Sequence, residues 1–141
     1  NDRVDVAMAV DANGVHLGIS DISVKEARRL CPDKFLIGAT AHSLSEARSA
    51  VDDGADYLGI GPMFASETKP HSQPKGPSLF TSILNEYPFL PHLAIGGITP
   101  TNVTHLFSMN CQGVAVCDAI ASSGTPDQVV HSLITEAMQP T

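Results

Sequence analysis

Polar and small residues follow the short apolar runs of this 141-residue chain, and their types indicate phosphate chemistry. Carboxylates and hydroxyls are ligands for a hard cation such as Mg²⁺, while a lysine and exposed glycine N–H groups bind phosphate oxygens. We therefore expect a site for a phosphate ester held with a metal ion. The segments that carry these groups at the ends of the apolar runs are 1–2, 18–21, 38–42, 61–69, 96–97 and 117–118.

The apolar runs recur with a regular spacing that predicts the elements positioning these residues. They start at residues 14, 35, 56, 92 and 113, so three of the four steps are 21 residues long. Each run is rich in Val, Ile and Leu and nearly continuous, which is typical of parallel strands buried on both faces. Helical patterns lie between and beside the runs, at Val4–Val10, Val24–Leu30, Leu44–Val51, Leu79–Tyr87, Val103–Phe107 and Val129–Met138.

Alternating strands and helices at this spacing predict βα units with right-handed crossovers. Neither GxGxxG after the first strand nor GxxxxGK[ST] is present, which disfavours nucleotide-binding folds. The expected fold is therefore α/β, a parallel (β/α)₈ TIM barrel, of which residues 1–141 form a single partial domain with the last five to six units. We expect these residues alone not to form a stable monomer, because runs 14–18 and 113–117 would be unpaired sheet edges.

Composition excludes several classes of partner. With 8 basic and 15 acidic residues and a net charge of −7, the chain has no basic footprint for nucleic acid. No apolar run approaches the roughly 18 residues of a membrane span, and no secretion signal opens the chain. The three cysteines lack metal-site spacing and fit a reducing cytoplasm. We expect a cytoplasmic protein with small-molecule partners, and a homo-oligomer is compatible with the sequence.

The order of motifs resembles the thiamine phosphate synthase family over essentially the whole chain. The most diagnostic stretches are GADYLGIGPMF at 54–64 and AIGGITPTN at 94–102, both shared with the related thiazole tautomerases. The resemblance implies a Mg²⁺-dependent transferase that joins hydroxymethylpyrimidine diphosphate to thiazole phosphate. Pyrophosphate leaves first, the resulting pyrimidine-methyl cation is captured by the thiazole nitrogen, and thiamine phosphate is formed.

The resemblance also implies roles for the candidate residues. Asp2 and Asp21 match metal-binding and catalytic aspartates, and Asn1 matches a substrate-binding asparagine. Thr40 stands where the family usually has a serine near the pyrimidine. Lys69 would stabilise the negative charge on the leaving pyrophosphate. Phosphate oxygens would be bound by Ser66, Thr68, Lys69, Gly96, Gly97 and the turn at Cys117-Asp118, where Cys117 offers only its backbone N–H.

Two departures from the family pattern leave alternatives open. Ile19 replaces a common glutamine, and Asp118 places a carboxylate where a serine usually faces phosphate. One alternative is a tautomerase in which His42 transfers protons, although the retained Asp2, Asp21 and Lys69 argue against it. The other is a phosphate-ligand-binding relative without catalysis. For His16, on an interior strand, we expect a hydrogen-bonded core histidine.

Overall fold

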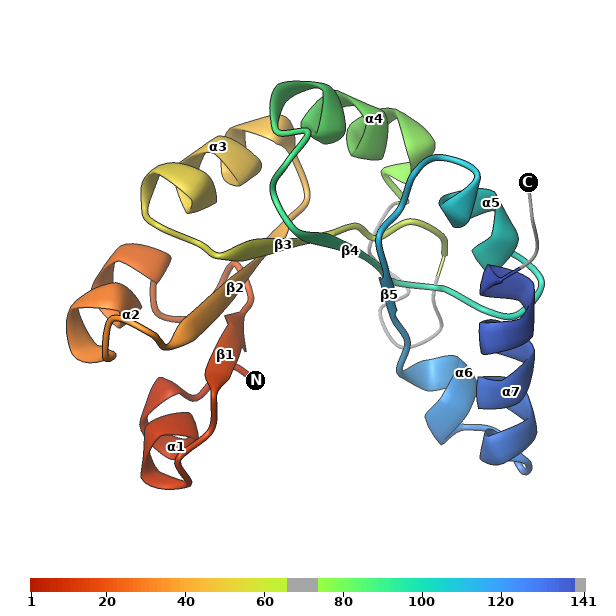
Figure 1. Ribbon diagram of the computed structural model, residues 1–141, viewed down its shortest axis with the longest axis horizontal. Helices are drawn as coiled ribbons and strands as arrows, with labels where there is room; N and C mark the ends of the chain where they lie inside the picture. The colour runs from red at the N-terminus through yellow and green to blue at the C-terminus, as the bar shows by residue number, and fades with distance from the viewer. Residues whose placement is uncertain (66–73, 139–141) are drawn as a thin grey trace.

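A computed structural model describes residues 1–65 and 74–138, which form a parallel five-stranded sheet with helices on one side (Figure 1). The strands are β1 (Gly14–Leu17), β2 (Leu36–Ala41), β3 (Tyr57–Ile60), β4 (His92–Ile95) and β5 (Val114–Ala115). The helices are α1 (Val4–Ala9), α2 (Val24–Leu30), α3 (Leu44–Asp52), α4 (Gly76–Glu86), α5 (Val103–Phe107), α6 (Asp118–Ala121) and α7 (Pro126–Ala137).

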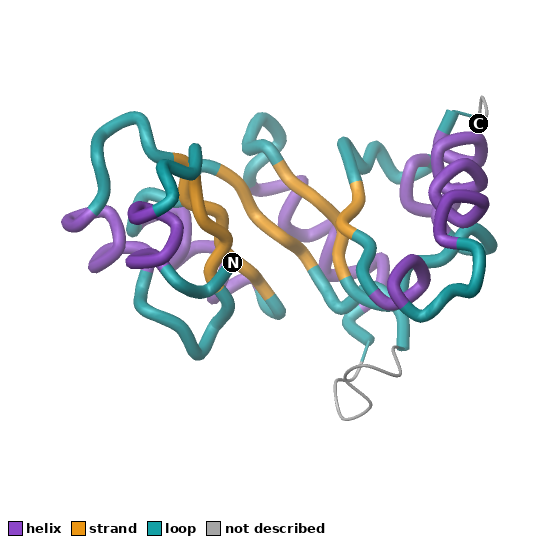
Figure 2. Tube along the Cα trace, turned by 90° about the horizontal axis from the view of Figure 1, so that it is seen from below, coloured by secondary structure: helices purple, strands orange, loops and turns teal. Residues whose placement is uncertain are grey.

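The sheet curls into an open arch with the helices on its convex face (Figures 1 and 2). Its strand order is β1-β2-β3-β4-β5, all parallel, so β1 and β5 are its edges among the described residues. The predicted succession of βα units is confirmed in this coarser form. The structure shows a curled parallel sheet of five strands, and the eight-unit barrel stays a prediction.

Sequence and structure differ mainly at helix starts. The predicted helix at 79–87 begins at Gly76, because Pro77 fits the first turn, where its missing N–H costs nothing. Pro100 is typical of a first helical position, but 99–102 form a turn and α5 begins at Val103. The four-residue helix α6 is absent from the predicted elements, since one turn is too short to show periodicity.

The hydrophobic core lies between the sheet and the outer helices. Phe80 and Ile83 of α4 belong to one hydrophobic cluster with Ile37, Leu58 and Leu106, all nearly inaccessible to solvent. Burying a large apolar side chain stabilises a fold by roughly 1.5–3 kcal/mol, so this layer holds the helices on the convex face.

The concave face is more open than the convex one. Leu36 at its amino-terminal side is 52% exposed, and Leu93 is half-buried. An open hollow of about 440 Å³ lies there, lined also by Tyr57 and Gln112. The interior side chains of the sheet are therefore accessible in this structure.

An arginine on α2 ties the starts of two strands together. The Arg28 guanidinium donates to the backbone oxygens of Phe35 and Gly54, each at 2.7 Å, and forms an ion pair with Asp56 at 2.7 Å. The same Asp56 oxygen accepts the Ile37 N–H at 2.6 Å. Arg28 thus fixes the relative position of β2 and β3 at their amino-terminal ends.

We expect Arg28→Ala to lower the free energy of unfolding by about 2 kcal/mol, because hydrogen bonds to a charged group are lost and two backbone oxygens lose their donor. Urea denaturation of the whole protein measures this change. The neighbouring Arg29→Ala, on an exposed position of the same helix, is the matched control and should change stability by less than about 0.5 kcal/mol. Equal effects of both substitutions would contradict the role of Arg28.

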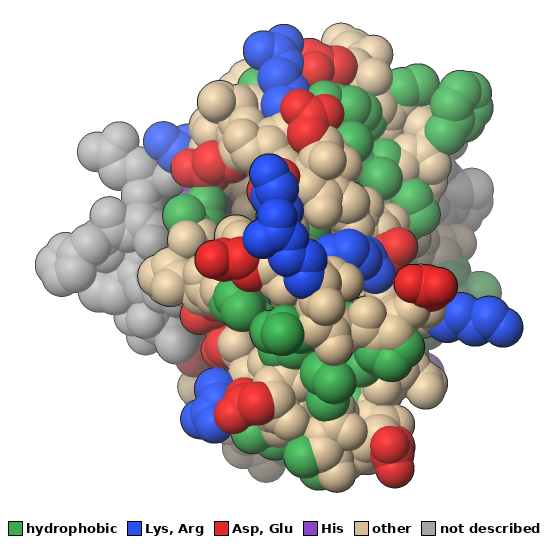
Figure 3. Space-filling model, turned by 90° about the vertical axis from the view of Figure 1, so that its left-hand side faces the viewer, with side chains coloured by type: hydrophobic (Ala, Val, Ile, Leu, Met, Phe, Trp, Pro, Cys, Tyr) green, Lys and Arg blue, Asp and Glu red, His purple; other side chains and the backbone are tan. Residues whose placement is uncertain are grey.

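The side of the molecule formed by α1 to α3 mixes charges of both signs with exposed hydrophobic side chains (Figure 3). Val6, Val10 and Leu30 are 48%, 68% and 59% exposed there. Among residues 1–65 and 74–138, no helix has the length and hydrophobicity required to cross a membrane.

Candidate functional site

Two carboxylates lie beside the carboxyl end of β1. The N–H of Asp2 donates to the carbonyl of His16 at 2.9 Å, which brings the start of the chain to this strand. Asp21 lies in the turn after β1, where its Oδ2 accepts the N–H of Gly18 at 2.6 Å. The structure therefore brings two of the predicted site residues, 19 positions apart in sequence, to one strand end.

The charges of both carboxylates act on the imidazole of His16. Burial is the largest influence and lowers the pKa of His16. The charge of Asp2 raises it, the terminal amino group lowers it, and the charge of Asp21 raises it. Both negative charges therefore act on the same half-buried imidazole. Asp2 and Asp21 concentrate negative potential at the carboxyl end of β1, where a cation is favoured.

This pair fits the donor set of a Mg²⁺ ion that substrate completes. Oδ1 of Asp21 and both Asp2 carboxylate oxygens accept no hydrogen bond from the described residues, so three oxygens are available. In the part of the chain that the structure describes, no three His, Cys, Asp or Glu side chains form a metal cluster. Mg²⁺ is commonly held by one or two carboxylates plus substrate phosphates and water, so two carboxylates suffice.

His16 connects the carboxylate end to the interior of the sheet. Its Nε2 lies 2.9 Å from Oγ1 of Thr40 on β2, and its Nδ1 lies 3.2 Å from the hydroxyl of Tyr57 on β3. Two glycines make room for the rings. A Cβ on Gly38 would lie 2.0 Å from Cζ of Tyr57, and one on Gly59 would lie 2.9 Å from Cε1 of His16. The expected hydrogen bonds of His16 are present, but its ring is half-buried on the concave face and is not part of the core.

The Gly96-Gly97 turn after β4 packs tightly against the segment at 61–65. Both glycines have positive φ, +87° and +67°, and the carbonyl of Gly96 accepts the N–H of Phe64 at 3.1 Å. A Cβ on Gly97 would lie 2.4 Å from the carbonyl oxygen of Ala65. Asn102 closes the turn by donating to the carbonyl of Gly97 and accepting from Thr99 N–H. The two glycines are thus required by backbone shape.

Asp118 makes a local hydrogen bond within α6. Its Oδ1 accepts from the Ser122 hydroxyl at 2.8 Å, one helical turn later, and the side chain is half-buried. Cys117 is exposed and precedes the helix. The carboxylate that departs from the family pattern therefore has a partner at the end of its own helix.

The remaining predicted residues are less closely tied to this edge. Asn1 is exposed, and its carbonyl accepts the N–H of Arg3. The predicted phosphate ligands Ser66, Thr68 and Lys69 lie outside the described residues. His42 follows β2, and its backbone N–H donates to Glu46 at 2.6 Å. An open hollow of about 240 Å³ beside β1 and β2 is lined in part by Asp21, Thr40, Ile19 and Glu46.

Tyr57 is the residue near the site that sequence reasoning did not select. It belongs to the diagnostic GADY stretch, but its role depends on strand register. Tyr57 pairs with Gly38 across β2 and β3, and His16 pairs with the same Gly38 across β1 and β2. Two glycines at interior strand positions are the signal that bulky neighbours occupy the space.

Comparison with known proteins gives a consistent family. The model of the family described as thiamine monophosphate synthase matches residues 1–120. A thiamine-phosphate synthase of Chloroflexus aurantiacus is 48% identical over 124 residues, which cover 87% of this chain and 56% of that protein. One from Methanoculleus marisnigri is 43% identical over 136 residues, covering 94% and 63%.

A solved structure extends the similarity to the fold. A thiamine phosphate pyrophosphorylase from Pyrococcus furiosus superposes with a TM-score of 0.86 at 35% sequence identity, covering 96% of this chain and 64% of that one. The chain therefore spans little more than half the length of some curated relatives and less of others, as with the 38% of a synthase from Synechococcus.

Proposed function

Because the chain belongs to the thiamine monophosphate synthase family, we propose that the protein joins hydroxymethylpyrimidine diphosphate to thiazole phosphate, giving thiamine phosphate and pyrophosphate. The observation that carries the proposal is the convergence of Asp2 and Asp21 beside β1, next to the His16–Thr40 contact. These groups can hold a diphosphate with its counter-ion at one end and an aromatic ring at the other.

In this reaction the C–O bond to the diphosphate breaks, and the thiazole nitrogen then forms the new C–N bond. Asp2 and Asp21 would hold a Mg²⁺ ion, which when bound would neutralise negative charge on the leaving pyrophosphate. Thr40 contacts the pyrimidine, while Lys69 adds a point charge on the pyrophosphate. Backbone N–H groups of Gly96 and Gly97 bind the thiazole phosphate together with Ser66, Thr68 and the turn at Cys117-Asp118. No protein nucleophile is needed.

The same proposal includes three further properties of the whole protein. The curled parallel sheet with helices on its convex face (Figure 1) supports an eight-unit barrel. The acidic composition and unpaired cysteines support a cytoplasmic location. Exposed apolar side chains on α1 and α2 are compatible with a homo-oligomer.

Isothermal titration with hydroxymethylpyrimidine diphosphate, with and without Mg²⁺, followed by product analysis, tests the function. We expect Mg²⁺-dependent binding and release of pyrophosphate when thiazole phosphate is added. Binding without turnover would favour the non-catalytic relative. Isomerisation of a thiazole phosphate that requires His42 and ignores the diphosphate would favour the tautomerase.

Asp118 gives a prediction about affinity. We expect Asp118→Ser to tighten binding of thiazole phosphate about threefold to tenfold, because a like charge leaves the neighbourhood of a phosphate dianion. Titration of the whole protein with thiazole phosphate measures the change. Asp127→Ser, on exposed α7, removes the same charge elsewhere and serves as the control. Unchanged affinity would mean that the hydrogen bond to Ser122 keeps the carboxylate away from the ligand.

A further inference from the structure

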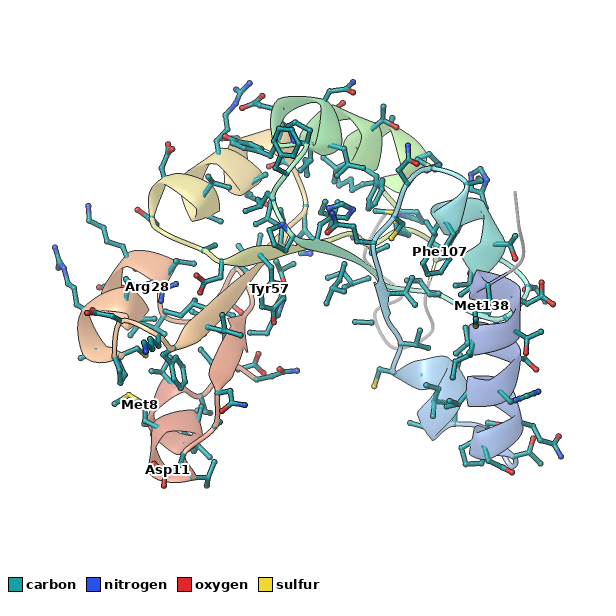
Figure 4. The ribbon with its side chains drawn as sticks, in the orientation of Figure 1. Met8, Asp11, Arg28, Tyr57, Phe107 and Met138 are labelled. Carbon is teal, nitrogen blue, oxygen red and sulfur yellow. The ribbon has the colours of Figure 1, made fainter. Side chains whose placement is uncertain are left out.

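Three side chains from neighbouring strands form a continuous hydrogen-bonded chain on the concave face. Tyr57 projects from β3 into the space inside the arch (Figure 4). Its hydroxyl contacts Nδ1 of His16 at 3.2 Å, and Nε2 of His16 contacts Oγ1 of Thr40 at 2.9 Å. The Tyr57 and His16 rings are 5.5 Å apart and tilted by 35°. Thr40, the proposed substrate contact, is therefore linked through His16 to Tyr57.

A neutral imidazole donates from one nitrogen and accepts at the other, so this chain can run in only two directions. In the first, Tyr57 donates to Nδ1, Nε2–H donates to Thr40, and the Thr40 hydroxyl hydrogen is left for a ligand. In the second, Thr40 donates to Nε2, Nδ1–H donates to Tyr57, and Thr40 offers a ligand only lone pairs. The two directions give Thr40 opposite hydrogen-bonding character.

The chemistry of the two hydroxyls favours the first direction. A phenol, with a pKa near 10, is a stronger acid and hence a better hydrogen-bond donor than the alkyl hydroxyl of threonine. Its oxygen lone pair is delocalised into the ring, which makes it the weaker acceptor. Placing the imidazole proton on Nε2 pairs the better donor, Tyr57, with the ring lone pair and the better acceptor, Thr40, with the ring N–H.

The position of the carboxylates favours the same direction. Strand register sets His16 and Tyr57 level with Gly38, and Thr40 lies two residues nearer the carboxyl end of β2. Nε2 therefore faces the end of the sheet at which Asp2 and Asp21 lie. Negative charge at that end stabilises the ring proton on the nearer nitrogen.

We propose that Tyr57 is a positioning residue that holds His16 in its Nε2–H tautomer and so leaves the Thr40 hydroxyl hydrogen for an acceptor atom on the substrate. This inference rests on the proposed function in one respect, the identity of the acceptor. For a pyrimidine substrate, the acceptor is a ring nitrogen. The tautomer itself is a property of the free protein.

Nitrogen-15 NMR of the whole protein labelled in histidine tests the tautomer at pH 8, where an ordinary imidazole is neutral. His16→Gln identifies the His16 signals among the six histidines. We expect a protonated Nε2 and an unprotonated Nδ1. In Tyr57→Phe, Nδ1 loses its hydrogen-bond donor, so the fraction of the Nε2–H form should fall. Tyr87→Phe, the other tyrosine of the chain, should leave the His16 signals unchanged.

A predominant Nδ1–H form in the unsubstituted protein, or no change in Tyr57→Phe, would overturn the proposal. Steady-state kinetics then tests the second part of the proposal, the hydrogen bond from Thr40 to the substrate. Thr40→Val and Tyr57→Phe should raise KM for the pyrimidine diphosphate about threefold to tenfold, whereas the control Tyr87→Phe should leave it unchanged. An unchanged KM in Thr40→Val would overturn this second part. Absence of synthesis in the unsubstituted protein would refute the proposed function and leave the tautomer result standing.

Discussion

Asp21→Asn is expected to lower kcat/KM for the synthesis of thiamine phosphate by at least about 100-fold in the whole protein. Asparagine has the same shape but no charge, so the carboxyl end of β1 would lose half of the negative charge that Asp2 and Asp21 provide. The fold should persist, because the asparagine side-chain oxygen can still accept the Gly18 N–H. We expect stability to change by less than about 1 kcal/mol.

The measurement combines a Mg²⁺ titration with a binding experiment. The apparent affinity for Mg²⁺ in the presence of pyrimidine diphosphate should fall together with kcat/KM, and circular dichroism should report an unchanged melting curve. Asp33→Asn is the matched control, since Asp33 is an exposed carboxylate on the loop before β2, at the opposite end of the sheet. Asp21 would be removed from the proposed site if the two variants had the same kinetics and Mg²⁺ dependence.

Much of the fold could be predicted from the sequence because its strands are rich in Val, Ile and Leu, although only the convex face of the sheet is fully buried in this structure. Such strands read as continuous apolar runs, and every predicted run overlaps an observed strand. Helix α2 coincides with its prediction, since Ser23 and Glu26 form a reciprocal cap that marks its start. Helix α6 could not be predicted, because its four residues contain too little periodicity.

The candidate site, too, could be predicted from the sequence only in part. Asp2 and Asp21 could be selected because residues after parallel strands gather at one edge, whatever the exact register. The contact between His16 and Tyr57 joins residues 41 positions apart, and it depends on both strands being level with Gly38. A shift of one residue would turn a side chain to the opposite face, and sequence spacing alone does not set that register.

Gly97→Ala is expected to be the most destabilising of these substitutions, at about 3 kcal/mol or more. Two costs add at this position. The φ of +67° places an alanine in the left-handed region, which costs roughly 1–2 kcal/mol. The new Cβ would also lie 2.4 Å from the carbonyl oxygen of Ala65 and 2.6 Å from that of Phe64, and backbone atoms cannot rotate away as a side chain can. Chemical denaturation of the whole protein measures the loss.

Two other glycines separate these costs. Gly76 has a φ of +62°, and a Cβ added there would have no atom within 4 Å, so Gly76→Ala should cost only the backbone term, about 1 kcal/mol. Gly124 has open space and no positive φ, so Gly124→Ala should be neutral or slightly stabilising. If Gly97→Ala costs no more than Gly76→Ala, the segment at 61–65 can move away from the turn. In that case the close packing of Gly96-Gly97 against 61–65 does not fix the shape of the proposed phosphate site.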